Sequence, residues 1–419
     1  MASGTIAHPE LEQIQRIGGA DLVIGILDPG NDPGALPAAV VDVLSTLKAT
    51  HRAVVLGRGF AIKPDFPNPA ESKESEPSGV AFVNLAEPEN ANASLQGVLD
   101  SYLAVLTVSS KLAARACVVI GSELRVAHVQ TVVYQLVQPL LELGFDLVMP
   151  RYDRQRTEGL LNRSILAPFS RALYGERIQN PMGPDFGLSG KLLQMLLAHR
   201  QGKSRGYDIH PVASVASAAA CHGLRICESH LGARVQMPAQ RTDLSSLLAT
   251  VLGAAFSDTE LNAPFWQRIR GSKPVPWFGE PESAPVEPGP LDVQPMIESF
   301  HLGTQNFQEI WGNVLPPTTL LELKRLARLP TAQFHMPDDL WASMVYDFAL
   351  GHRLRMISRD HLLRSMTPLY RGWIASYALE TENAGLREVE SRLEQLSAVF
   401  EARKPYLVSR WRWPDRFNP

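Results

Sequence analysis

Residues 148–191 read VMPRYDRQRTEGLLNRSILAPFSRALYGERIQNPMGPDFGLSGK, and this stretch decides the predicted fold. It begins as an apolar strand that ends at Pro150 and continues into a polar segment. A short helix is predicted over residues 165–174, and a Gly-rich turn over residues 181–187 leads into another helix near Ser189. Because open α/β sheets bind ligands beyond the carboxyl ends of their strands, the polar segment and the Gly-rich turn predict a ligand site there.

The chain before this stretch alternates strand and helix patterns. Residues 20–27 (ADLVIGIL) form a nearly continuous apolar run, which is typical of a strand buried on both faces. The turn DPGNDPG follows, then an amphipathic helix and a second strand at residues 52–56. Further strands are predicted at residues 82–85, 116–120, 145–149 and 224–227. This β-α-β order predicts an α/β fold with a mostly parallel sheet.

The composition changes near residue 271 and suggests a division into domains. We expect an N-terminal extension over residues 1–19 and an α/β domain over residues 20–270. Residues 271–295 are rich in Pro and predict an extended linker. Residues 296–419 show only helical patterns, so an α-helical C-terminal domain is expected there.

Bulk composition limits the partners and the compartment. The chain has 419 residues and a formal net charge of -3, which argues against a nucleic-acid partner. Three cysteines favour a reducing compartment over a disulfide framework. No secretory signal is visible, and no apolar stretch reaches the length of about 18 residues that a membrane span needs. We therefore expect a cytoplasmic protein without a membrane span.

Several common catalytic motifs are missing or have the wrong spacing. The run GPDFGLSGK is too long for a phosphate loop, and Leu192 stands where Ser or Thr would hold the metal ion. The Cys and His residues between Cys221 and His230 fit no zinc spacing. No G-x-S-x-G elbow and no GxGxxG fingerprint occurs, which argues against a hydrolase and against a dinucleotide-binding Rossmann domain.

Five segments together resemble one enzyme group. They are VVIGSELR after the fourth strand, PRYDRQRTEG, LAPFSRALYGERIQNPMGPDFGLSG, GYDIH and, in the helical part, MPDDLWASMVYDFALG. The chain is similar in these segments to GT-A glycosyltransferases of the mannosylglycerate synthase and glucosyl-3-phosphoglycerate synthase type. The resemblance extends from about Ala20 to about Glu380. It implies a GT-A fold and a retaining transfer from a nucleotide sugar.

The resemblance also implies a divalent cation, Mg²⁺ or Mn²⁺, held by an Asp-x-Asp turn after the fourth strand. Here that turn reads Gly121-Ser122-Glu123, so Glu123 is the one carboxylate left to bind a metal ion. Gln236 stands where the group places a metal-binding His. We therefore expect weak or no metal dependence, with the Arg125 charge replacing that of the metal ion.

The same resemblance places the other site residues. Asp28, Glu123 and Arg125 are predicted to face the nucleotide sugar. Arg151, Tyr152, Arg154, Asn162 and His210 are predicted to bind an acidic acceptor. Asp185 and Asp208 are predicted to act in catalysis. A simpler interpretation remains for several of them: the Arg residues could form a solvated loop, Asp185 could cap a helix, and Glu123 could pair locally with Arg125.

Two functions follow from these expectations. The first is a glycosyltransferase that moves a hexose from GDP-mannose or from UDP- or GDP-glucose to a small acidic acceptor such as glycerate or phosphoglycerate. The second is a catalytically inactive protein of the same fold that binds a sugar, a nucleotide or a protein partner. The aromatic-rich helical tail could also bury a homodimer interface.

Overall fold

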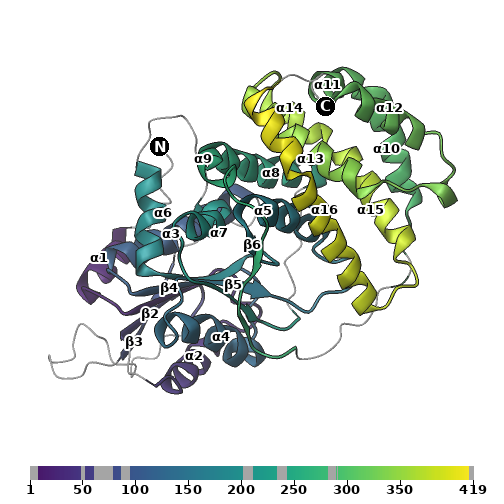
Figure 1. The fold of residues 1–419 in the computed structure, drawn as a ribbon. Coiled ribbons are helices and arrows are strands. Elements are labelled where there is room, and N and C mark those ends of the chain that lie inside the picture. Colours follow the sequence, from purple (N-terminus) through teal and green to yellow (C-terminus); the bar gives the residue numbers. More distant parts are fainter. Residues whose placement is uncertain are drawn as a thin grey trace. The chain divides into compact units, whose positions relative to one another are not determined.

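The computed structural model describes residues 8–48, 52–60, 79–85, 95–201, 211–233, 243–281, 289 and 291–414. The chain divides into two compact units, each built from segments distant in sequence. The sheet unit comprises residues 1–153, 182–242 and 275–284, and the helical unit comprises residues 154–181, 243–274 and 285–419. Figure 1 shows the elements of both units along the chain.

An eight-stranded sheet forms the centre of the sheet unit, with the strand order β10-β8-β5-β7-β4-β1-β2-β3. All neighbouring strands pair in parallel except β7, which is antiparallel to both β4 and β5. The strands are β1 (Leu22–Ile26), β2 (Arg52–Gly57), β3 (Gly79–Asn84), β4 (Ala116–Ile120), β5 (Leu147–Arg151), β7 (Asp185–Ser189), β8 (Ile226–His230) and β10 (Trp277–Phe278).

Helices cover both faces of this sheet (Figure 1). Helices α2 (Leu36–Ser45) and α4 (Val129–Leu141) pack on one face, where apolar side chains such as Ile24, Val118 and Val148 form the core with them. The opposite face carries α3 (Leu95–Lys111), α6 (Gly190–Gln201) and α7 (Pro211–Cys221). The strands are buried on both faces, which explains why β1 and β4 are apolar at every position or nearly so. Helix α1 (His8–Ile17) precedes β1.

The helical unit contains α5 (Ala167–Tyr174), which continues from a π-helical turn at Asn162–Leu166. Its other helices are α8 (Leu244–Leu261), α9 (Ala263–Trp266), α10 (Gln294–Asn306), α11 (Gln308–Val314), α12 (Pro317–Leu326), α13 (Asp338–Leu354), α14 (Arg359–Ser365), α15 (Thr367–Glu380) and α16 (Leu386–Arg412). The short strands β6 (Glu176–Arg177) and β9 (Lys273–Pro274) pair with each other. Large aromatic side chains such as Trp341, Tyr346 and Phe400 fill the core of this unit.

The predicted class, a mostly parallel α/β sheet followed by a helical C-terminal part, is confirmed. One local prediction was wrong. Residues 185–189 form the antiparallel strand β7 rather than the end of a Gly-rich turn before a helix. The stretch predicted as an extended linker includes the two-residue strands β9 and β10, and α10 begins near its end, at Gln294. Within the described residues, no helix is both long and apolar enough to cross a membrane.

Candidate functional site

The order in which the chain adds strands to the sheet reverses between β1 and β4. The chain proceeds from β1 to β2 and β3 on one side, and β4 then returns to the other side of β1. In open α/β sheets, ligands bind beyond the carboxyl ends of the strands at such a switch point. The turns that follow β1 and β4 are therefore the candidate functional site.

These two turns contact each other directly. The Leu124 amide donates to the Asp28 carbonyl at 2.9 Å, so the turn after β4 lies against the turn after β1. Asp28 Oδ1 accepts from the Gly30 amide at 3.1 Å, and Gly30 has a left-handed φ of 65°. A side chain at position 30 would place its Cβ only 3.3 Å from the Glu123 carboxylate. The turns after β1 and β4 therefore bring Asp28 and Glu123 close together.

Asp28 carries a buried acceptor that the described residues leave unsatisfied. Its Oδ2 is shielded from solvent and has no hydrogen-bond partner among them, whereas Oδ1 holds the turn. A buried carboxylate oxygen without a donor is costly, by about 1–3 kcal/mol or more. Such an oxygen is suited to accept a hydrogen bond from a ligand hydroxyl or N–H group.

Glu123 and Arg125 form a two-point ion pair on the turn after β4. Arg125 Nε donates to Oε1 at 3.1 Å, and Nη2 donates to Oε2 at 2.9 Å. These hydrogen bonds raise the pKa of the Arg125 guanidinium above its ordinary value. The Glu123 side chain is 14% exposed and that of Arg125 is 56% exposed, so the positive partner faces solvent.

Position 121 has no room for a side chain. A Cβ on Gly121 would lie 1.7 Å from the Tyr102 hydroxyl oxygen and 2.7 Å from the Pro184 carbonyl oxygen. Burial, with a further contribution from Asp185, raises the pKa of the Tyr102 hydroxyl, which donates to the Pro184 carbonyl at 2.8 Å. An aspartate at position 121 would therefore have to displace this tyrosine.

These contacts decide whether a carboxylate-held cation fits the turn. Position 121 cannot carry a carboxylate, and both oxygens of Glu123 are bound by Arg125. No group of three or more His, Cys, Asp or Glu residues arranged to hold a metal ion occurs in the part of the chain that the structure describes. The described residues do not fit a divalent cation at this turn. Gln236 lies outside the described residues.

Asp185 occupies a different setting from the predicted one. It is fully buried at the start of β7, and its carboxylate accepts from the amides of Gly121 and Ser122, both at 2.9 Å. The Ser122 hydroxyl donates to it at 2.5 Å, and the Tyr152 hydroxyl donates at 2.9 Å. These hydrogen bonds occupy the carboxylate, so we assign Asp185 a structural role in fixing the turn after β4 rather than contact with the reacting sugar. Tyr152, predicted to bind substrate, belongs to the same network.

The predicted acceptor residues are divided between the two units. Arg151 ends β5 in the sheet unit, where its Nη1 donates to the Glu228 carboxylate at 3.1 Å. Arg154 and Asn162 belong to the helical unit. The Arg154 side chain packs over Gly159, and Asn162 donates to the Gln179 carbonyl and, at 3.0 Å, to Asn180 Oδ1. Asp208 and His210 lie outside the described residues.

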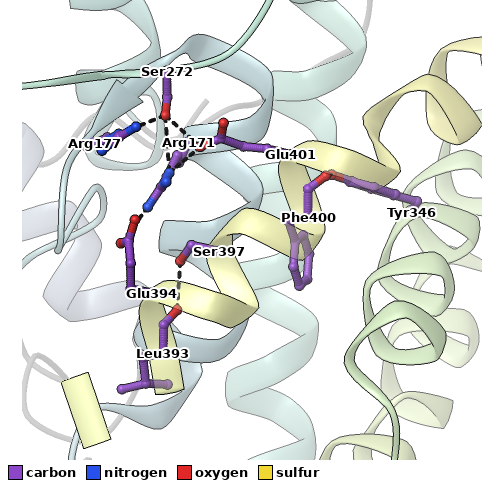
Figure 2. Close-up of polar contacts among 9 residues, drawn as sticks. All are labelled: Arg171, Arg177, Ser272, Tyr346, Leu393, Glu394, Ser397, Phe400 and Glu401. Atoms are coloured by element: carbon purple, nitrogen blue, oxygen red, sulfur yellow. Dashed lines mark hydrogen bonds and ion pairs between the residues drawn. The ribbon is translucent and has the colours of Figure 1, made fainter. Parts of the chain in front are cut away.

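Arg171, another cation of the same sequence region, is held within the helical unit. It lies on α5 and donates to Glu394 at 2.6 Å, to Glu401 and, at 3.2 Å, to Ser272 (Figure 2). Its side chain is only 8% exposed. Arg171 therefore connects α5 to α16, and its role is structural.

Sequence reasoning missed three residues, one beside the turn after β4 and two farther along the sheet. Tyr102 was recognised only as part of a helical pattern, Glu228 lies in the strand ICESH, and Trp277 lies in the stretch predicted as a linker. A carboxylate within an apolar strand pattern was a usable signal for Glu228, since such residues are rarely buried without a partner. An aromatic pair, Trp277-Phe278, among prolines was a weaker signal for Trp277.

Comparisons with known proteins give similarity in structure only. No protein-family model matches the chain, and no curated protein sequence matches it. Among solved structures, the fold is similar to glucosyl-3-phosphoglycerate synthase from Mycobacterium tuberculosis in complex with Mn²⁺, UDP and phosphoglyceric acid. The identity is 16%, the match covers 60% of this chain and 81% of that chain, and the TM-score is 0.32.

A second structure of that synthase, in complex with Mg²⁺ and UDP, matches at 17% identity over 60% of this chain and 82% of that chain, with a TM-score of 0.33. A third, in complex with Mn²⁺, UDP-glucose and phosphoglyceric acid, matches at 16% identity over 60% and 82% of the two chains, with a TM-score of 0.29. Similarity at this level does not assign a function. The enzyme group named here is one that the sequence motifs resemble.

Proposed function

We propose that this protein is a glycosyltransferase that moves a hexose from a nucleotide sugar to an acidic acceptor, and that it does so without a carboxylate-held cation. The unsatisfied Asp28 oxygen at the switch point carries the proposal, because it is a buried acceptor where an α/β sheet binds its ligand. Nucleosides supply hydroxyl and N–H donors for such an oxygen. The motif resemblance to sugar-nucleotide transferases supports the same donor class.

Arg125 would donate hydrogen bonds to the diphosphate. Its guanidinium is the exposed member of the pair with Glu123, and guanidinium groups bind phosphate oxygens through two parallel hydrogen bonds. Glu123 would orient Arg125 instead of binding a metal ion. The leaving diphosphate would then be stabilised by a fixed positive side chain, in the way that Arg clamps stabilise transferring phosphoryl groups.

On the acceptor side, Arg151 at the end of β5 would bind the acid. The proposed acceptor class is a glycerate or phosphoglycerate. Asp208 would supply the acidic group near the reacting sugar, since Asp185 is engaged in the buried network. The proposed donors are GDP-mannose and UDP- or GDP-glucose.

Calorimetric titration with UDP, GDP and their glucose and mannose conjugates, each in excess EDTA, tests the donor half of this proposal. We expect the nucleotides to bind in EDTA and their affinity not to increase when Mn²⁺ is added. Arg125→Ala should lower the nucleotide affinity by about tenfold or more, the effect of losing a charge-assisted hydrogen bond. Arg115→Ala is the matched control, because Arg115 is also exposed but precedes β4 at the opposite end of the strand.

Two results would contradict the proposal. Binding that appears only with Mn²⁺ would mean that a cation site exists despite the geometry at Gly121. Failure of every nucleotide to bind would leave a protein of this fold that binds another partner. The transfer itself is tested by measuring the release of UDP or GDP from the nucleotide sugar when glycerate or phosphoglycerate is added.

A further inference from the structure

A second polar group of residues lies along the same edge of the sheet, away from the switch point. β5 and β8 pair in parallel with Arg151 opposite His230, and β10 pairs with β8 with Trp277 opposite Glu228. Alternate residues of a strand share a face, and paired residues on neighbouring strands do so as well. Arg151, Glu228, His230 and Trp277 therefore all lie on one face at the carboxyl ends of their strands.

These side chains contact one another in sequence. The Arg151 guanidinium donates to the Glu228 carboxylate at 3.1 Å and stacks over the Trp277 ring, 5.0 Å from its centroid. The Glu228 side chain is 1% exposed and the Arg151 side chain 25% exposed. The pair neutralises most of the charge of Arg151 and fixes the guanidinium against the indole.

Trp277 is unusual among the tryptophans of this chain. It is 47% exposed, whereas the other tryptophans are nearly or fully buried except Trp413 near the end of the described chain, at 69%. A large aromatic ring left in solvent forgoes the stabilisation that burial would give it. An exposed indole, held from one side by an arginine, has the form of a platform for a ligand ring.

Asp153 supplies a polar group that contacts His230, which lies on the same face as Trp277. Its Oδ1 lies 3.2 Å from His230 Nε2, whose other ring nitrogen accepts from the Gly232 amide at 3.4 Å. Asp153 Oδ2 is buried and has no hydrogen-bond partner among the described residues. This carboxylate oxygen is therefore suited to accept a hydrogen bond from a ligand hydroxyl group.

We propose that Trp277, Arg151 and Asp153 form a subsite for a hydroxylated ring of the hexose type, with the ring stacked on Trp277 and a ring hydroxyl donating to Asp153. This proposal rests on the proposed function and extends it to the acceptor. β10 lies four strand positions from β4, so Trp277 lies well along the sheet from the switch point at which the nucleotide is proposed to bind. We therefore assign the ring to the acceptor. The subsite therefore extends the proposed acceptor class from glycerate and phosphoglycerate to acids of this kind that also carry a sugar ring.

Fluorescence quenching by acrylamide tests this subsite. In a Trp413→Phe protein, Trp277 is the only tryptophan of the described chain that is substantially exposed, so it dominates the quenchable signal. The probes are methyl α-glucoside, methyl α-mannoside and glucuronic acid, with uridine as a control that has no hexose ring. We expect the three sugars to protect Trp277 from quenching by acrylamide. Uridine, which can stack only through its base, should protect Trp277 less than any of the sugars.

Two variants make the result specific. Trp277→Phe in the same background should remove the quenchable signal, which assigns it. Asp153→Asn should weaken sugar protection about tenfold, while Arg115→Ala should leave it unchanged. Sugars that fail to protect Trp277, or uridine that protects it better than any sugar, would overturn the subsite. Sugar protection without any binding of UDP or GDP would uphold the subsite and overturn the proposed donor chemistry.

Discussion

Gly121 illustrates how one position without a side chain can exclude a charge from a site. The space that its Cβ would need is filled by the Tyr102 hydroxyl and the Pro184 carbonyl. The Tyr102 ring in turn stacks on Phe186 with ring centroids 5.9 Å apart, which limits its freedom to move. The absence of a carboxylate at position 121 is therefore a property of the surrounding packing as well as of the sequence.

We predict that Gly121→Ala lowers the free energy of unfolding by about 1–3 kcal/mol or more, because overpacking a filled site forces neighbours out of position. Urea unfolding measures the change. Gly19→Ala is the control, since a Cβ there would make only an ordinary contact, with the Leu112 carbonyl oxygen at 3.7 Å. An equal effect at both positions would mean that Tyr102 moves aside at little cost.

A second prediction concerns Asp185. Asp185→Asn should lower the free energy of unfolding by about 1–3 kcal/mol, because an amide cannot accept from all the donors that face this carboxylate. Tyr152→Phe, which removes one of those donors, should cost less. Thermal unfolding measures both. Loss of transferase activity in Asp185→Asn at unchanged stability would restore the catalytic role predicted from the sequence.

The sequence predicted part of this site and could not predict the rest. Asp28, Glu123 and Arg125 follow apolar strands, so their place at the carboxyl edge could be anticipated. The contact between Tyr102 and Gly121 joins a helix to a turn, and no local pattern encodes it. The engagement of Asp185 depends equally on Tyr152, 33 residues away in the chain.

Among the elements, β7 was missed because its sequence, DFGLS, is short and contains a glycine. A Cβ on Gly187 would lie 2.8 Å from the Leu140 side chain, so glycine is required there by the close approach of α4 rather than by a turn. The start of α10 was missed because Pro295 suggested a linker, although proline is favourable in the first turn of a helix.

The connection between α5 and α16 gives a prediction for the helical unit. Arg171→Ala should lower the free energy of unfolding by about 3–5 kcal/mol, since it leaves the partly buried carboxylate of Glu401 without its cation. Arg325→Ala is the matched control, because its pair with Glu322 is exposed and is expected to contribute less than about 1 kcal/mol. Similar losses in the two variants would show that Arg171 contributes no more than a surface ion pair.

Helix α16 also supplies a buried lysine. Lys404 Nζ donates to the carbonyls of Leu173 and Ile269, at 3.2 and 3.0 Å. Burial, with a smaller contribution from Arg270, lowers the pKa of Lys404 from 10.5 to about 8. The unfolded chain therefore binds more protons than the folded chain between about pH 8 and 10.5.

Stability conferred by this residue should accordingly rise with pH across that window. We expect the difference in unfolding free energy between the wild type and Lys404→Met to increase by at most about 1.4 kcal/mol per pH unit. Denaturant unfolding at several pH values measures it. Parallel pH profiles of the two proteins would show that Lys404 titrates at its ordinary pKa.

For the whole molecule, the tryptophans are distributed unequally. All tryptophans except Trp277 belong to the helical unit, and those that are buried there include Trp266, Trp311, Trp341 and Trp373. Tryptophan emission therefore reports mainly the helical unit, with Trp277 as the contribution of the sheet unit, whereas far-UV circular dichroism reports helices and strands of both units.

This distribution predicts which spectroscopic signal a substitution in the sheet unit would change. In Gly121→Ala, circular dichroism should show an earlier loss of structure in urea, while the midpoint of tryptophan emission stays unchanged, because the substitution lies in the sheet unit. Both signals are recorded on the same samples. Transitions that move together would show that the two units unfold as one.

The contact between Tyr102 and Gly121 also constrains the order in which mutations could be accepted. An aspartate at position 121 would meet the tyrosine, whereas a smaller residue at position 102 alone would leave a cavity beneath Gly121 and cost stability. Neither single step is favourable, and even the pair would have to move the Pro184 carbonyl, which a Cβ at position 121 would approach to 2.7 Å. The two positions are epistatic, so carboxylate-dependent and carboxylate-free versions of this turn are separated by at least two coupled substitutions and a backbone shift.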